Sequence, residues 1–209
     1  MKHRQPFQLK TFLTFYNVFQ VLSCVYFLVE IFRTGYQWDY LWKCYMPGHE
    51  NLAHVKLLYF YHFLKITELL ETFCFILRKK FNQMSFLHVY HHASTLLFSY
   101  FGVTLVGSGM LVTLYTLNMI VHSIMYSYYL ASIYVKDLDK IVSVKKSITI
   151  MQMVQFTLLI FNASRSYWTN CGVDPLFFAL FIPNIAVIFW QFYSFYQKAY
   201  RSKGAKAKA

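Results

Sequence analysis

The chain has 209 residues, of which 57% are hydrophobic, 21% aromatic and only 13% charged, and this is too little polar surface to cover an ordinary soluble globule. Its 20 Lys and Arg outnumber its 8 Asp and Glu, which gives a net charge of +12. A basic nucleic-acid-binding surface would mix basic with exposed aromatic residues, but here the aromatic residues lie inside apolar stretches. Composition and charge therefore exclude a soluble or nucleic-acid-binding domain and favour a membrane protein.

Apolar stretches long enough to cross a bilayer follow one another along the chain. A span needs about 20 residues, and in lipid its backbone groups must bond within the segment, so each span is a helix. The sequence predicts six such helices, over residues 11–32, 52–77, 84–106, 110–134, 147–166 and 175–197. We expect an all-α, polytopic membrane bundle as one domain over 1–200, followed by a disordered basic tail at 201–209. The first apolar run is too long for a cleavable signal peptide.

The basic residues gather at alternate ends of these spans. If the amino terminus is cytoplasmic, six spans put both ends of the chain there. The cytoplasmic segments then carry Lys2, Arg4, Lys10, Arg78, Lys79, Lys80, Lys136, Lys140, Lys145, Lys146, Lys198, Arg201, Lys203, Lys206 and Lys208. The opposite loops keep Arg33, Lys43 and Arg165. This bias is typical of the positive-inside rule and predicts that orientation.

The four cysteines divide between spans and loops. Cys24 and Cys74 fall within spans, where we expect them to pack as small apolar side chains. Cys44 and Cys171 fall in two loops on the non-cytoplasmic side, which is a compartment that permits oxidation. The sequence predicts a Cys44–Cys171 disulfide that ties these loops together, with two free loop thiols as the alternative.

The run His88-Val89-Tyr90-His91-His92 puts three imidazoles inside the third predicted span. Residues three and four apart share one helix face, so these rings should project into one interior site. Ionisable groups at membrane depth usually face a bundle interior or a water-filled cavity and mark a functional site. The alternative is that neighbouring helices simply satisfy the three rings.

Polar residues on the neighbouring spans fall at a similar depth. With a helical rise of about 1.5 Å per residue, they lie in the half of the bilayer nearest the cytoplasm. They are Lys65, Glu68, Glu71, Asn118, His122, Tyr126, Gln152 and Gln155. The sequence therefore predicts a tunnel, open to the cytoplasmic side, enclosed by the six helices. Two alternatives stay open: Lys65 and Glu68 as an ion pair that only locks helices, and the glutamines as interhelical contacts.

Clustered histidines also hold metals. Membrane di-iron desaturases and hydroxylases carry His-x-x-His-His boxes, but they need about three boxes to surround two metals. Of the 8 histidines here, His3 and His49 lie outside the spans and His54 near the far end of its helix. Only His62 and His122 could join the triplet. We therefore expect no metal at this site.

Four blocks of sequence resemble the signature blocks of the ELO family, the fatty acid elongases. In order, they are Lys65–Thr72, Leu87–His92, Asn118–His122 with Met125–Tyr129, and Thr149–Gln155. The resemblance covers essentially the whole chain. Two departures matter: Glu71 stands where the family usually has Asp, and family members usually have one more span before the segment that begins at Pro6.

The resemblance implies a condensing enzyme of the endoplasmic reticulum membrane. It would join a long-chain acyl-CoA with malonyl-CoA to give 3-oxoacyl-CoA, CoA and carbon dioxide, through an acyl-histidine intermediate. We expect His91 to be the nucleophile, His122 to act in the condensation, and His88 and His92 to be positioning or acid-base partners. The expected substrate contacts are Lys65, Glu68, Glu71, Asn118, Tyr126, Tyr129, Gln152 and Gln155, with Asn118 and Gln152 holding the malonyl group or an oxyanion.

Basic residues at the cytoplasmic mouth could meet the phosphates of CoA. We expect this of Arg78, Lys79, Lys80, Lys145 and Lys146, and the alternative is orientation and lipid headgroup binding alone. The two CoA esters are the expected substrates, and no cofactor is expected. Expected partners are membrane lipid and the reductases and dehydratase of the elongation cycle, with a homodimer left open. A membrane scaffold or small transporter remains the non-enzyme alternative.

Overall fold

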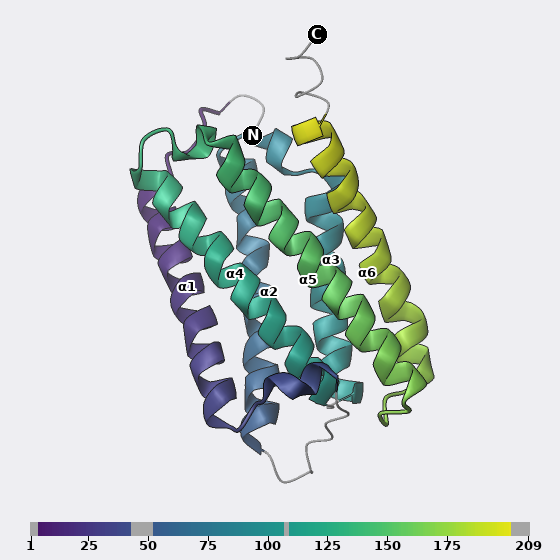
Figure 1. Cartoon of the computed structure of the whole chain (residues 1–209). Coiled ribbons are helices and arrows are strands. Elements are labelled where there is room, and N and C mark those ends of the chain that lie inside the picture. The colour runs from purple at the N-terminus through teal and green to yellow at the C-terminus, as the bar shows by residue number, and fades with distance from the viewer. Residues whose placement is uncertain (1–3, 43–51, 107–108, 202–209) are drawn as a thin grey trace.

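The computed structural model describes residues 4–42, 52–106 and 109–201. Within these ranges the chain is helical and contains no strand, which confirms the all-α class. The six long helices are α1 Lys10–Arg33, α2 Leu52–Leu77, α3 Phe86–Phe101, α4 Gly109–Tyr134, α5 Val142–Trp168 and α6 Pro175–Tyr196. They run up and down as one bundle (Figure 1). α5 begins five residues before its predicted span because its first turn, with Lys145 and Lys146, continues the helix beyond the apolar segment.

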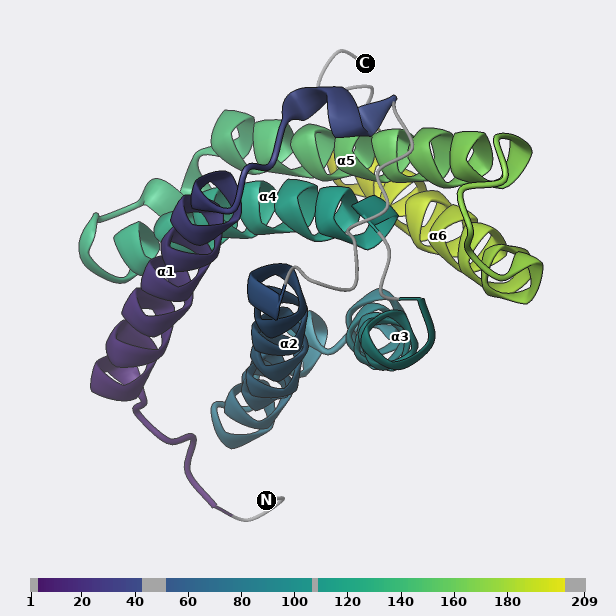
Figure 2. The same ribbon diagram turned by 90° about the horizontal axis from the view of Figure 1, so that it is seen from below.

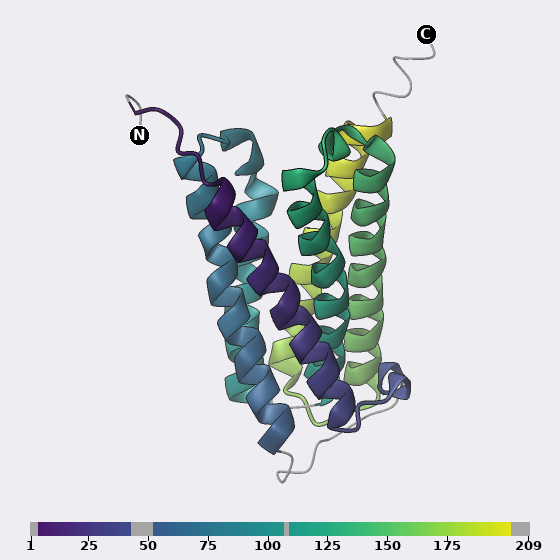
Figure 3. The same ribbon diagram turned by 90° about the vertical axis from the view of Figure 1, so that its left-hand side faces the viewer.

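The helices form a closed ring. Packing contacts join them in the order α1, α4, α5, α6, α3, α2 and back to α1. Figure 2 shows this arrangement from one end, and Figure 3 shows α1 crossing obliquely between the α2/α3 side and the α4/α5/α6 side. Helices that are neighbours in the sequence are therefore not always neighbours in space, and the ring encloses an interior to which every helix contributes.

Short irregular turns complete the chain and set where the helices start. The 3₁₀ turns are η1 Trp38–Leu41, η2 Phe81–Gln83 and η4 Leu138–Lys140, and the π-helical turns are η3 Gly102–Val106 and η5 Gln197–Arg201. The N-cap of α3 is Ser85, whose hydroxyl accepts a hydrogen bond from the backbone N–H of His88. This cap satisfies an otherwise unpaired helix donor and places His88 in the first turn of α3.

The outer surface is apolar, as lipid requires. Within the described ranges, three helices are long and apolar enough to cross a membrane by length and composition: α1, α5, and α6 continued to Arg201. α2 is interrupted by interior-facing charges such as Lys65 and Glu68. Large apolar side chains such as Phe15, Phe73 and Trp190 are exposed around the ring. The structure is that of a multi-pass membrane protein.

The start of α1, the end of α2, the start of α5 and the end of α6 meet at one end of the ring (Figure 1). Lys10, Arg78, Lys145 and Arg201 lie there, and we call it the basic end. That it faces the cytoplasm stays a prediction. The predicted tail lies outside the described residues except for Arg201, which still belongs to a helical turn.

The cysteines agree with the predicted division as far as they are described. Cys24 and Cys74 are buried free thiols in α1 and α2. Cys171 lies buried between α5 and α6 and is disulfide-bonded. Cys44 lies outside the described residues, so its pairing with Cys171 stays a prediction.

Candidate active site

A cavity of about 1480 Å³ runs from the basic end into the ring. Its outer wall carries Lys10, Arg78, Lys80 and Lys145, and its inner wall carries histidines of two helices. Side chains from all six long helices contribute to the lining. The cavity matches the predicted tunnel in being open at the end where the basic residues gather.

The three histidines of α3 reach this cavity together. His88, His91 and His92 all line it. The ring centroids of His88 and His92 lie 4.3 Å apart, and those of His91 and His92 lie 5.4 Å apart. The spacing of three and four residues thus produces the single interior cluster that it predicts.

His91 occupies an apolar niche at the cavity wall. Its ring lies edge-on to Phe156 of α5 and Phe192 of α6, each with its centroid 6.3 Å from that of the imidazole. Within the described part of the chain, the His91 ring makes no side-chain hydrogen bond. A ring nitrogen of His91 is therefore available to a molecule that enters the cavity.

His122 of α4 is paired with a carboxylate of α2. Its Nδ1 lies 3.1 Å from Oε1 of Glu68, and Nζ of Lys65 lies 2.8 Å from the same oxygen. Lys65 and Glu68 are each 1% exposed. The cation balances the carboxylate at a depth where an unpaired charge would be strongly unfavourable. This pair does not lock two helices, because both members belong to α2; its carboxylate instead faces histidines of other helices.

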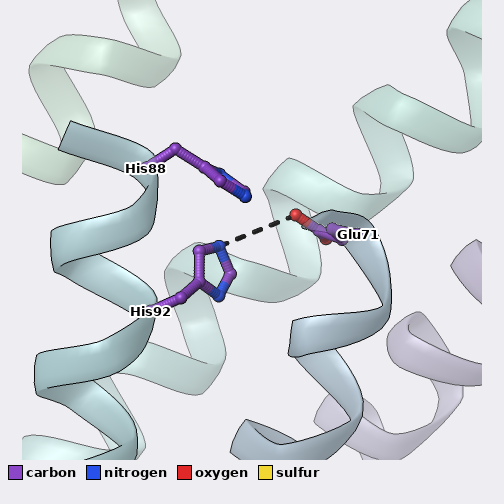
Figure 4. A group of neighbouring side chains, drawn as sticks. All are labelled: Glu71, His88 and His92. Atoms are coloured by element: carbon purple, nitrogen blue, oxygen red, sulfur yellow. Dashed lines mark ion pairs between the residues drawn. The ribbon is translucent and has the colours of Figure 1, made fainter. Parts of the chain in front are cut away.

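A second carboxylate lies on the other side of His92 (Figure 4). Oε2 of Glu71 is 3.8 Å from Nε2 of His92, while Oε2 of Glu68 is 3.9 Å from its Nδ1. His88 is held by a hydrogen bond of 3.1 Å between its Nε2 and Oγ1 of Thr72. His92 is therefore flanked by carboxylates at both ring nitrogens.

The trio of Glu71, His88 and His92 could also hold one metal ion. One ligand atom from each lies within 4.8 Å of the others, and two imidazoles with one carboxylate are a common metal donor set. Within the residues that the structure describes, no second group of this kind accompanies it. The geometry suits a single ion rather than two.

Sequence reasoning missed a polar network on α1. Nε2 of Gln20 donates to the hydroxyl of Tyr16 and to Oγ1 of Thr67, both at 3.0 Å. The Tyr16 hydroxyl in turn donates to Oε1 of Glu71 at 3.4 Å. Gln20, an amide in the middle of the first apolar span, was the available signal. Its partner helix could not be read from the sequence.

Comparison with known proteins identifies the family. The model of the GNS1/SUR4 (ELO) family matches residues 1–208. The chain belongs to the ELO family. It is 33% identical over its whole length to very long chain fatty acid elongase 7 of Drosophila melanogaster, of which it covers 65%.

Two mammalian relatives agree with this assignment. The ELO-family chain is 34% identical over 96% of its length to very long chain fatty acid elongase 4 of Homo sapiens, covering 65% of that protein. It is also 34% identical over 99% of its length to very long chain fatty acid elongase 2 of Mus musculus, covering 71%. The chain thus spans about two thirds of the length of these relatives.

Most of the predicted site residues of this ELO-family chain reach the cavity, and some do not. The cavity wall includes His88, His91, His92, His122, Glu71, Asn118, Tyr129, Gln152, Gln155, Arg78, Lys80 and Lys145. Lys65, Glu68 and Tyr126 lie behind it: Tyr126 is fully buried, with its ring centroid 5.7 Å from that of His122. These three support the wall from behind.

Two of the predicted CoA-binding lysines are also absent from the wall. Lys79 sits in the turn after α2 with a φ of 55°. Nζ of Lys146 lies 5.9 Å from the ring centroid of Tyr196 on α6. Because neither lines the cavity, their part in binding CoA stays a prediction without support from the geometry.

The two glutamines of α5 differ in their contacts. Nε2 of Gln152 donates to the sulfur of Met125 on α4 at 3.6 Å. This bond fits the alternative that the glutamines make contacts between helices. Nε2 of Gln155 makes no hydrogen bond within the described residues, although the side chain is buried and lines the cavity. The Nε2 atom itself is enclosed by protein, so a contact of Gln155 with substrate stays a prediction.

Proposed function

We propose that this protein is the condensing enzyme of a fatty acid elongation cycle. It joins a long-chain acyl-CoA with malonyl-CoA, releasing CoA and carbon dioxide and forming 3-oxoacyl-CoA through an acyl-histidine intermediate. Membership of the ELO family and three relatives named as elongases support the class of reaction. The observation that carries the mechanism is the imidazole of His91, which is unpaired among the described residues and lines the same cavity as His122, the partner of Glu68.

The first step transfers the acyl group to the protein. A ring nitrogen of His91 attacks the thioester carbonyl, a carbon–nitrogen bond forms, and the carbon–sulfur bond breaks. The second ring nitrogen of His91 loses its proton, which reaches the departing thiolate, so free CoA leaves. The side-chain amide of Gln155, turned toward the cavity that this residue lines, donates to the oxygen that becomes negative in this step. The Phe156 and Phe192 rings keep bulk water away from the acyl-imidazole.

The second step forms the new carbon–carbon bond. Malonyl-CoA loses carbon dioxide, and the electron pair of the broken bond becomes a thioester enolate. The enolate carbon attacks the acyl carbon on His91, and the imidazole leaves and takes up the one proton that the overall reaction consumes from the solvent outside the basic end. His122, oriented by Glu68, donates to the enolate oxygen while it is negative. The malonyl contact expected of Asn118 is not part of this proposal, because Asn118 lies about one turn deeper on α4 and accepts a hydrogen bond from Tyr61.

The basic end would bind the common part of both substrates. Arg78, Lys80 and Lys145 line the outer wall, where they would meet the phosphates of CoA. This arrangement requires the basic end to face the cytoplasm, with both ends of the chain there, in the endoplasmic reticulum membrane. The reductases and dehydratase that act on the product would be its partners. We propose no metal and no organic cofactor.

Acyl transfer to His91 can be tested with one substrate. The full chain in lipid nanodiscs is incubated with acyl-CoA alone, and free CoA is quantified while peptides are examined by mass spectrometry. We expect up to one CoA per protein and a mass increase of one acyl group on the peptide carrying His91. His91→Ala should abolish both, whereas His62→Ala, at a histidine bonded to Ser99 outside the cavity wall, should not. CoA release by His91→Ala at the normal extent would refute this mechanism.

One observation favours a second candidate. The Glu71, His88 and His92 trio would suit a metal-dependent membrane oxidation enzyme. That function requires stoichiometric bound metal and loss of activity on chelation. Elongation of acyl-CoA that persists after chelation, in protein without bound metal, decides for the condensing enzyme.

A further inference from the structure

Two stacked tyrosine rings close the interior beyond the cavity. Tyr61 of α2 and Tyr115 of α4 lie parallel, with centroids 3.7 Å apart and an angle of 2° between the planes. Both are buried, and neither lines the cavity. Asn118, about one turn nearer the basic end than Tyr115, does line it and accepts a 3.0 Å hydrogen bond from the Tyr61 hydroxyl. The stack therefore begins where the cavity wall ends.

The two rings are anchored on several sides. Beside the bond to Asn118, Tyr61 has Nζ of Lys65 4.9 Å from its ring centroid. The Tyr115 hydroxyl donates to the backbone carbonyl of Ser99 on α3 at 3.4 Å. A Cβ at Gly102 would collide with this hydroxyl, so glycine makes room for the ring. The stack thus reaches from α2 through α4 to α3, across the interior of the ring of helices.

The region beyond the stack is a packed apolar core. Phe27 has its ring centroid 6.3 Å from that of Tyr61 and is 0% exposed. Leu58, Leu111 and Val112 are buried to a similar degree and belong to the same cluster. Protein interiors of this density hold few voids larger than a water molecule. An alkyl chain that enters from the basic end has open space up to the stack and filled space behind it.

We propose that the Tyr61–Tyr115 stack is the floor of the acyl-binding tunnel and sets the longest acyl chain that the protein accepts. The inference rests on the proposed function for the identity of the ligand, an acyl-CoA whose thioester lies at His91. Its hydrocarbon chain extends from His91 toward Asn118 and ends against the rings. A longer chain would have to displace two anchored aromatic side chains, while a shorter one leaves part of the tunnel empty.

Chain-length dependence of binding measures the position of this floor directly. Each additional methylene buried in an apolar site strengthens binding by about fourfold, and the gain stops when the chain reaches the floor. The probes are S-alkyl-CoA thioethers of increasing length, which cannot transfer an acyl group, and the sample is the full chain in nanodiscs. For the unaltered protein we expect affinity to rise steadily and then level off or fall at one chain length.

Variants of the two rings should move that limit. Tyr61→Leu and Tyr115→Leu act from different helices, and each should shift it to a longer chain, with at least a tenfold gain in affinity for the first thioether beyond the original limit. Tyr61→Phe keeps the ring and loses only the bond to Asn118, so the limit should stay. Tyr59→Leu, on the exposed side of α2, should also leave it in place. Thermal unfolding in nanodiscs identifies any variant that fails to fold. If only one of the two leucine variants folds, that variant is enough for the test.

The outcomes separate this inference from the proposed function. A limit that stays at the same length in a folded Tyr61→Leu or Tyr115→Leu protein overturns the floor. One outcome is that the leucine variants bind longer thioethers than the unaltered protein while labelled malonyl-CoA gives no condensation. That result would support the Tyr61–Tyr115 stack as the floor and refute the proposed function. Where condensation occurs, the products of the leucine variants should be longer than those of the unaltered protein, and products of unchanged length would contradict the assignment.

Discussion

Nδ1 of His122 lies 3.1 Å from Oε1 of Glu68, which pairs an imidazole of α4 with a buried carboxylate of α2. A carboxylate in this position fixes the orientation of the ring and favours one tautomer, as in catalytic triads. Lys65 contacts the same oxygen and balances the negative charge of Glu68. The roles of charge balance and ring orientation can therefore be separated by mutation.

We predict that Glu68→Gln and Lys65→Met each destabilise the protein by about 3–5 kcal/mol, because each leaves one buried charge unpaired. The double variant should recover most of that stability but not activity, because His122 still lacks its carboxylate. We expect its condensation rate to remain about 10²-fold or more below normal. Unfolding in mild detergent and labelled malonyl-CoA incorporation provide the two measurements. A double variant with normal activity would show that Glu68 serves stability alone.

The two proposed histidine roles predict different failures. His122→Ala should still release CoA from acyl-CoA and carry the acyl group on His91, but it should not turn over when malonyl-CoA is added. His91→Ala should do neither. Rapid mixing with acyl-CoA alone and then with malonyl-CoA resolves the two steps. Acyl transfer that fails in His122→Ala, while the acyl-CoA still binds, would assign His122 to the first step.

The hydrogen bonds of Gln20 and Tyr16 on α1 should affect the reaction rate through Glu71. Gln20→Leu removes two hydrogen bonds and should lower the free energy of unfolding by about 1–3 kcal/mol. Tyr16→Phe keeps the ring and removes the donor to Glu71, so we expect kcat to fall a few-fold with KM nearly unchanged. Steady-state kinetics of each variant test this. An unchanged kcat in Tyr16→Phe would limit the network to a structural role.

The basic side chains of the outer cavity wall should bind the phosphates of CoA through their charge. Lys145→Gln and Arg78→Gln should each raise the KM for acyl-CoA by about threefold to tenfold, an effect that weakens in high salt. Lys140→Gln serves as the matched control, because this lysine is exposed, pairs with Asp137 and does not line the cavity. Equal effects of all three substitutions would indicate a general surface potential rather than contacts with phosphate.

Metal removal should leave the reaction intact. Because His88 and His92 are expected to be positioning or acid-base partners rather than metal ligands, we expect chelation to leave acyl transfer and condensation unchanged, with bound metal well below one ion per protein. Elemental analysis and activity before and after chelation check this. One tightly bound ion per chain that disappears in Glu71→Gln would contradict the assignment and establish the trio as a metal site.

The sequence alone predicted the helices and the cluster on α3 because both depend on local rules. A span must be helical in lipid, and a spacing of three and four residues puts side chains on one helix face. Depth along each helix was enough to bring Asn118, His122 and Gln155 into one cavity with the histidines. The family blocks added the proposed roles.

Only the tertiary structure decided which helices face one another, because packing around the ring does not follow chain order. The contact of Glu68 with His122 joins helices that have α3 between them in the chain, and the network of Tyr16 depends on how α1 lies against α2. The parallel stacking of Tyr61 on Tyr115 likewise depends on the approach of α2 to α4. Spacing assigns each of these residues to a face and a depth, whereas its partner across the interior is determined by the mutual packing of all six helices.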